Sequence, residues 1–178
     1  QRVAAIPKQL PHAPGRVVLQ GELYWRLRGH VQADAGGINA RSAVAGALAR
    51  EQLDDASAAR IGLFVWDWPS GPADMPARLA GLAAMGLSDS VSYTKPVRTL
   101  AEVTRWREQW YRHAMPFAAD GTVVRQGHRP AASTWRPAPP DWAVAWKYPA
   151  ASALAAVRAV DFAIGRSGRI SPVRQLEP

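Results

Sequence analysis

The chain has 178 residues, and 48% of them are hydrophobic, which is enough apolar surface for a buried core and argues against a wholly disordered protein. Its 22 lysines and arginines outnumber 14 aspartates and glutamates. The formal net charge of +8 predicts a polyanionic partner such as nucleic acid, although a solvated basic surface has the same composition. There is no cysteine, which excludes disulfides, thiolate metal sites and cysteine nucleophiles. No apolar run approaches the roughly 20 residues that a transmembrane helix needs, so we expect no membrane partner.

Four segments in the first half of the chain carry patterns of secondary structure. Residues 17–25 combine β-branched and aromatic side chains and predict a strand that contains Glu22. A helix is expected to begin at Asn39, an N-cap type of residue, with apolar residues spaced for one buried stripe. The apolar run Ile61 to Trp66 predicts a central strand covered on both faces, and Asp74 predicts the start of a second helix.

The second half of the chain predicts one further helix and several strands. Thr99 and Glu102 have the spacing of a capping box, which predicts a helix start. Two strand-like segments follow, 116–125 and 142–149, and apolar alternation predicts another strand over 156–164. Because helices and strands intermix without a βαβ repeat, we expect an α+β fold built on antiparallel sheet, with a small β-barrel beginning near residue 157.

Four separated motifs resemble those of one enzyme family. They are Gly-Gly-Ile-Asn-Ala-Arg at 36–41, Pro-Phe-Ala-Ala-Asp-Gly-Thr-Val-Val-Arg at 116–125, Trp-Ala-Val-Ala-Trp-Lys-Tyr-Pro at 142–149 and Gly-Arg-Ser-Gly-Arg-Ile-Ser-Pro at 165–172. In this order they resemble the NAD-dependent DNA ligases of bacteria, and within them the B branch. The resemblance implies that residues 1–155 are the C-terminal part of an adenylation (nucleotidyltransferase) domain of antiparallel sheets with flanking helices. Residues 156–178 would then begin an OB-fold barrel.

The resemblance also implies a nucleotide site. Glu22 in Gln-Gly-Glu-Leu-Tyr would accept hydrogen bonds from the AMP ribose, Val123 would lie under the adenine, and Arg125, a lysine in most of the family, would meet phosphate. Asp120 would support the metal or its waters, and Lys147 would bind the α-phosphate in the transition state. From position alone each residue has a plainer interpretation: a solvent-facing strand glutamate, an Asp-Gly turn, or a lysine that reaches water.

Basic residues elsewhere predict contacts to DNA. By resemblance, Arg41 begins a helix that lies along the DNA backbone, and Arg50 and Arg112 are further candidates, although a surface arginine is often only solvated. A second hypothesis treats the chain as a DNA-binding module without nucleotide transfer. It would use Arg41, Arg112 and the loop from Arg129 to Arg136.

The family's reaction needs a nucleophile that this sequence does not supply. None of Lys8, Lys95 and Lys147 is followed by the x-Asp-Gly of the family's active-site motif. The chain begins at Gln1 and ends in mid-pattern, so we expect a fragment that does not adenylate itself. For the parent protein the resemblance implies NAD and Mg²⁺ as cofactors, nicked double-stranded DNA as partner with no obligate protein partner, and a place in the bacterial cytoplasm at the nucleoid. An ATP-dependent ligase or RNA-capping relative is a third hypothesis, because it shares the glutamate, Asp-Gly and lysine plan.

Overall fold

The computed structural model describes residues 3, 6–7, 9–13, 15–34, 40–150 and 154–177, without the side chains of residues 40, 41 and 132. The chain divides into two compact units, Gln1–Tyr148 and Pro149–Pro178, and the domain boundary that the sequence predicts, at residue 155, falls within the second unit. In chain order the elements are β1 Gln20–Trp25, α1 Ala40–Ala49, α2 Asp55–Ala59, β2 Ile61–Asp67, α3 Met75–Ala84, α4 Ser88–Ser92, α5 Leu100–Arg112, β3 Gly121–Arg125, a 3-10 turn Ala132–Thr134, β4 Ala143–Lys147, β5 Val157–Ile164 and β6 Ile170–Leu176.

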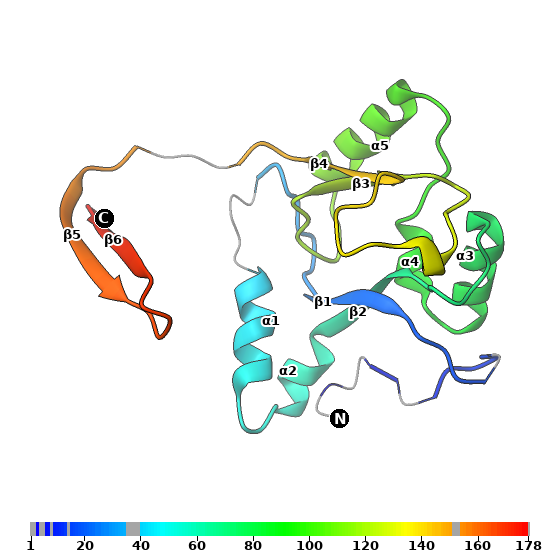
Figure 1. Cartoon of the computed structure of the whole chain (residues 1–178), viewed down its shortest axis with the longest axis horizontal. Helices are drawn as coiled ribbons and strands as arrows, with labels where there is room; N and C mark the ends of the chain where they lie inside the picture. The colour runs from blue at the N-terminus through cyan, green and yellow to red at the C-terminus, as the bar shows by residue number, and fades with distance from the viewer. Residues whose placement is uncertain are drawn as a thin grey trace. The chain divides into compact units, whose positions relative to one another are not determined.

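The first unit is organised around the antiparallel pair β1 and β2. Alternate side chains of this pair, including Leu23, Ile61 and Val65, pack into the two hydrophobic clusters of the unit. Helices α1 and α2 lie near the start of β2, and α3 and α4 lie near its end (Figure 1). The opposite face of the pair carries Glu22 and its cross-strand partner Phe64, which is the face that concerns the site.

Local sequence signals explain where the helices begin. Asp74 caps α3, as predicted, because its carboxylate accepts a hydrogen bond from the backbone N–H of Ala77 at 3.2 Å. Thr99 caps α5, and Glu102 completes the predicted capping box. Backbone hydrogen bonds from residues 98 and 99 lower the pKa of Glu102. The start predicted at residue 39 lies outside the described residues.

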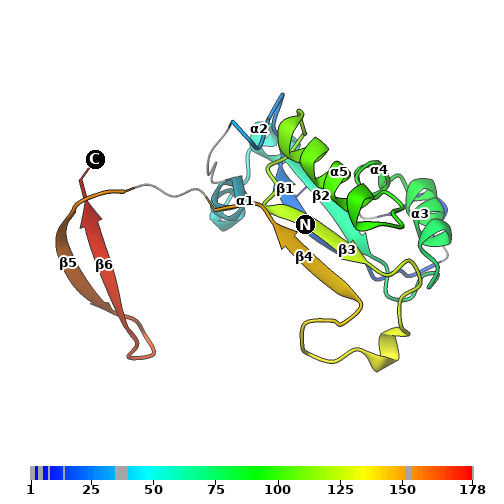
Figure 2. The ribbon, with the colours of Figure 1, turned by 90° about the horizontal axis from the view of Figure 1, so that it is seen from above.

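The second antiparallel pair, β3 and β4, is joined to the first by an aromatic cluster. Phe117, just before β3, makes edge-to-face contacts with Tyr24, Phe64 and Tyr93 at centroid distances of 5.1, 6.1 and 4.9 Å. A backbone bridge between His30 and Met115 adds a main-chain link. Figure 2 shows the two strand pairs in the same unit, with α5 beside β3. These contacts attach the segment that leads to Asp120 to the β1–β2 face that carries Glu22.

The second unit is an antiparallel hairpin of β5 and β6. Its apolar side chains are exposed within the unit, Phe162 to 71% and Ile164 to 74%. The mixed α/β fold with small antiparallel sheets agrees with the predicted class, and no closed barrel forms among the described residues. Whether the units are an adenylation domain and the start of an OB-fold stays a prediction.

One strand differs from the prediction. The sequence predicts a central strand at Ile61 to Trp66, whereas among the described residues β2 pairs only with β1. Its other edge is met by α4, where the hydroxyl of Ser90 accepts a hydrogen bond from the N–H of Val65 at 3.0 Å. Trp66 is 42% exposed, so the second face is also incompletely covered. A helix and a hydroxyl group therefore replace the expected neighbouring strand.

Candidate functional site

The centre of the candidate site is an ion pair between Lys147 and Asp120. The Lys147 Nζ lies 2.8 Å from the Asp120 Oδ2, and both side chains are largely exposed. Register brings them together, because Gly121 is the cross-strand partner of Lys147 and the N–H of Tyr148 donates to the carbonyl of Asp120 at 2.8 Å. A Cβ at Gly121 would lie 2.5 Å from the backbone oxygen of Trp146, so only glycine permits this close approach. The Asp-Gly pair is thus more than a turn signal.

The β3–β4 pair has an open face, and its other face is turned toward α5, although Val144 on that second face remains 65% exposed. Val123 pairs with Ala145, and together with Lys147 they lie on the open face, where Val123 is 62% exposed. Thr122 pairs with Trp146 on the face toward α5. An apolar side chain beside a lysine on an accessible strand surface suits the base and the phosphate of a nucleotide.

Arg107 of α5 supports the strand that carries Lys147. Its Nη2 donates to the carbonyl of Lys147 at 2.7 Å, and its guanidinium lies 4.7 Å from the ring centroids of both Trp146 and Tyr148. The Tyr148 hydroxyl donates to the carbonyl of Arg107 at 3.0 Å, and burial raises the pKa of Tyr148. The sequence analysis missed Arg107, because nothing in the sequence shows that its helix packs against β3.

Glu22 lies on the β1–β2 face that Phe117 contacts. Its side chain is exposed and shares this face with Phe64. Trp66, two residues beyond Phe64, is on the same face and 42% exposed, and the sequence analysis assigned it no role. The structure thus connects the strand faces of Glu22 and of Asp120 through Phe117. Within the part of the chain that the structure describes, the side chains of Glu22 and Lys147 do not contact each other directly.

Arg125 lies at the far end of β3 in a group of charges that we call the arginine cluster. The cluster consists of Asp67, Arg78, Arg125 and Arg129. Asp67 and Arg78 are buried, and Arg125 retains 16% exposure of its side chain. Burial lowers the pKa of Arg125 and of Arg78. Arg125 therefore reaches inward to a carboxylate, an interaction that the sequence analysis did not anticipate.

The arginine cluster corrects the second hypothesis from the sequence in one respect. Arg129 was expected in a loop that grips DNA, but its side chain is only 2% exposed and its Nη2 donates to the carbonyl of Trp68 at 2.6 Å. Arg129 also bonds to the carbonyls of Pro69 and Gly71. Because the Arg129 guanidinium is buried and bonded to backbone carbonyls, it cannot contact a phosphate. Arg129 is therefore a structural residue.

The other predicted DNA contacts differ in how far the structure describes them. The side chain of Arg41 lies outside the described residues. Arg50 forms an ion pair with Asp54 at 3.5 Å. Arg112 pairs with Glu108 one helical turn away, and this hydrogen bond raises the pKa of Arg112. Both ion pairs are exposed, so each contributes little to the stability of the fold. A phosphate can therefore compete for either guanidinium.

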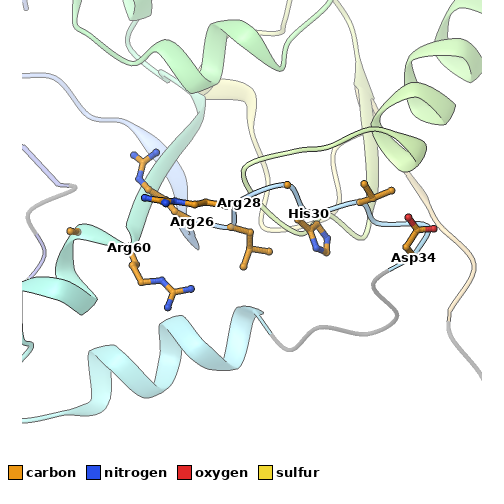
Figure 3. Close-up of a pocket in the computed structure, with 9 residues that line it drawn as sticks. Arg26, Arg28, His30, Asp34 and Arg60 are labelled. Carbon is orange, nitrogen blue, oxygen red and sulfur yellow. The ribbon is translucent and has the colours of Figure 1, made fainter.

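A depression with several basic residues lies elsewhere in the first unit. It has a volume of about 920 Å³ and is lined by residues 26–31, Asp34, Ala59 and Arg60. Figure 3 shows Arg26, Arg28 and Arg60 toward one end, and His30 and Asp34 toward the other. We call it the basic groove. Arg60 lies 4.8 Å from the ring centroid of Trp25. No residue predicted for the nucleotide site lines the groove, so it is a separate feature suited to anions.

No three acidic or histidine side chains in the described ranges come together as metal ligands. No helix in the described part of the chain is long and apolar enough to cross a membrane.

Comparison with known proteins finds relatives that are named DNA ligases, although no family model matches the chain. The chain is 54% identical over all 178 residues to a protein of Pseudomonas fluorescens (strain Pf0-1) and 53% identical over 174 residues to one of Pseudomonas putida (strain W619). Both relatives are named DNA ligase B. The chain covers 32% and 30% of their lengths. It is therefore similar over its whole length to one part of DNA ligase B, and the predicted resemblance to the B branch is confirmed.

Proposed function

We propose that the chain is part of the adenylation domain of an NAD-dependent DNA ligase that seals nicks. The Lys147–Asp120 pair on an accessible strand face is the observation that carries the proposal. Similarity to DNA ligase B supports it, and the alternatives of a DNA-binding module or an ATP-dependent ligase have no comparable support. On this proposal the whole protein transfers AMP from NAD to a lysine of its own and then to the 5′-phosphate at a nick. The 3′-hydroxyl finally displaces AMP.

The open face of β3 and β4 would hold the nucleotide. Lys147 is positioned to bind a phosphate, and it is held in place by Asp120 on one side and by the contacts of Arg107 to its backbone on the other. Val123 offers an apolar surface for the base, and the exposed Trp66 offers an aromatic one near Glu22. Glu22 supplies an exposed carboxylate that can accept hydrogen bonds from ribose hydroxyl groups.

Magnesium fits this site only in part from the described residues. Mg²⁺ commonly binds one or two carboxylates together with waters and substrate phosphates. Asp120 can supply one such carboxylate, and phosphate and water oxygens would complete the coordination. The metal would supply charge neutralisation at the phosphate. The protein's own contribution is to hold Lys147 beside that phosphate in a fixed orientation.

The basic groove would bind the phosphate backbone of the duplex. Arg28 and Arg60 present guanidinium groups whose planar forks match phosphate oxygens, whereas Arg26 is already paired with Asp89 at 3.8 Å. Arg60 is held against Trp25, which lowers the entropy that it loses on binding. If the groove contributes, replacing Arg28 and Arg60 by alanine should reduce the slope of log affinity against log salt by roughly 2.

The nucleotide part of the proposal is tested by titrating the 178-residue chain with AMP and with NAD by calorimetry. We expect binding by the parent chain and its loss in Lys147→Ala and in Glu22→Ala. Lys95→Ala is the matched control, because Lys95 lies over the ring of Trp106 of α5 and does not belong to β3 or β4. Binding unchanged by Lys147→Ala would contradict the proposed site.

The ligase part is tested by exchanging the matching third of P. fluorescens DNA ligase B for this chain. We expect the chimera to seal a nicked duplex with NAD and not with ATP, and to lose activity by a factor of about 100 or more with Lys147→Ala. Sealing with ATP alone would favour the ATP-dependent hypothesis. DNA binding without sealing or nucleotide binding would favour the DNA-binding module.

A further inference from the structure

One carboxylate faces three guanidinium groups in the arginine cluster. Asp67, the last residue of β2, is fully buried, and its Oδ1 lies 3.4 Å from the Nε of Arg78, 3.5 Å from the Nε of Arg129 and 3.8 Å from the Nη2 of Arg125. The Oδ1 also accepts a hydrogen bond from the N–H of Trp68 at 2.8 Å. This single carboxylate therefore balances a cluster with more positive than negative charge.

Two of the three arginines are occupied by the protein itself. Arg78 donates from its Nη1 to the carbonyls of Pro72 and Ala73, at 2.8 and 3.2 Å. Arg129 donates to three carbonyls of the same loop, residues 68–73. Both side chains are at least 98% buried. These two arginines hold the loop after β2 and have no access to a ligand.

Arg125 differs from the other two arginines. Its Nη2 approaches Asp67 and, at 3.9 Å, the sulfur of Met75. Within the described part of the chain its Nε and Nη1 have no hydrogen-bond partner, and its side chain keeps 16% exposure. A guanidinium has five N–H donors in a fixed plane. Arg125 is therefore anchored at one nitrogen and has donors left for a ligand.

The register of β3 and β4 determines which part of a nucleotide Arg125 can reach. Gly121 pairs with Lys147, and Arg125 pairs with Ala143, four residues further along the same face. At about 3.4 Å per residue, these positions are roughly 14 Å apart. The Lys147 side chain is directed toward Asp120, and the Arg125 side chain is directed toward Asp67. The two cations therefore do not converge on one phosphate. Arg125 is placed for another hydrogen-bond acceptor of the nucleotide.

We propose that Asp67 is a positioning residue that aims Arg125 at the bound nucleotide. The inference rests on the proposed function for the ligand, but its structural part concerns only Asp67 and Arg125. Without the Asp67 charge, Arg125 would face the like charges of Arg78 and Arg129 and would turn away from the strand face. With Asp67 present, the free edge of the guanidinium is fixed before the ligand arrives.

The experiment follows the side-chain Nε–Hε signal of Arg125 by NMR in the 178-residue chain, with Arg125→Lys used to assign it. We expect a restricted Arg125 in the parent chain and a mobile one in Asp67→Asn, which keeps the shape of the side chain. Unchanged order of Arg125 in Asp67→Asn would overturn the proposal. This readout needs no nucleotide, so it is independent of the proposed function.

Titrations with AMP, adenosine and NAD then test the consequence for binding. We expect roughly tenfold weaker binding by Asp67→Asn and by Arg125→Lys, the loss expected for one charge-assisted hydrogen bond, and no further loss in the double variant. Additive losses would overturn the proposal. A loss seen with adenosine places the acceptor on the adenine or its ribose, and a loss confined to NAD places it beyond the α-phosphate; either supports the role of Asp67.

Arg78→Lys is the matched control. It removes a partner of Asp67 that faces the loop, so we expect a lower melting temperature with unchanged affinity. If Asp67→Asn does not fold, Arg125→Lys alone decides: nucleotide affinity equal to that of the parent chain would overturn the proposal. If the folded parent chain binds no nucleotide, the proposed function fails, and the NMR comparison still decides whether Asp67 positions Arg125.

Discussion

Replacing Phe117 by alanine should weaken the connection between the two strand pairs. Phe117 makes three edge-to-face contacts, with Tyr24, Phe64 and Tyr93, at centroid distances between 4.9 and 6.1 Å. Each such pair contributes about 0.5–1.5 kcal/mol beyond the burial of area. Because Phe117 is only partly buried, we place the loss near the lower end of the range for Phe→Ala, about 3 kcal/mol. The melting temperature should then fall by roughly 6–12 °C.

Urea unfolding followed by tryptophan fluorescence measures this loss directly. Phe117→Leu is the control, since it keeps most of the apolar volume without the ring edges, and it should cost about half as much. If the alanine variant lost less than about 1 kcal/mol of unfolding free energy with an unchanged m value, Phe117 would not connect the two strand pairs as described above. The same variant should bind nucleotide more weakly, because the faces of Glu22 and Asp120 are no longer held together.

Three further predictions concern stability. Burial first, and then the hydrogen bond to Asp89, raises the pKa of Tyr24 above its ordinary 10.0, so the folded state favours the neutral phenol. The stability that it contributes is present below pH 10 and declines as the pH rises above it; unfolding measured from pH 8 to 11.5 should show a flatter decline in Tyr24→Phe. Thr99→Ala removes the cap of α5 and should cost about 1 kcal/mol, roughly 2–4 °C by calorimetry, whereas Thr99→Ser should cost little. Arg107→Ala should lower the free energy of unfolding in urea by about 1–2 kcal/mol, because it removes two ring contacts and a hydrogen bond to the backbone of β4. An equal loss in the control Arg105→Ala would refute this account.

Features that depend on short-range chemistry could be predicted from the sequence. The caps at Asp74 and Thr99 are local hydrogen bonds between residues three apart, and the apolar run from Ile61 predicted the existence of strand β2, although not its surroundings. The short helices α2 and α4 were missed, because five residues are too few to show a helical period. The neighbours of β2 could not be deduced either, since an apolar run does not specify whether a strand or a helix covers its edge.

The candidate site divides in the same way. Resemblance predicted Asp120 and Lys147, and their pairing across 27 positions follows from the register of two strands that the sequence marks. The inward orientation of Arg129 could not be predicted, because a segment rich in Pro, Arg and Ser normally predicts an exposed loop. Its partners are carbonyls about 60 positions earlier, and backbone carbonyls leave no trace in a sequence. Buried networks of this kind require the tertiary structure.

The close approach of β3 and β4 at Gly121 has a genetic consequence. The atoms nearest to a Cβ at this position are the carbonyl oxygen of Trp146 at 2.5 Å and the Cα of Lys147 at 2.6 Å, both of which belong to the main chain. A clash with a side chain can be relieved by a smaller residue at the obstructing position, but every amino acid carries these backbone atoms. We therefore expect a selection for intragenic suppressors of Gly121→Ala to return revertants at residue 121 and none at residues 146 or 147.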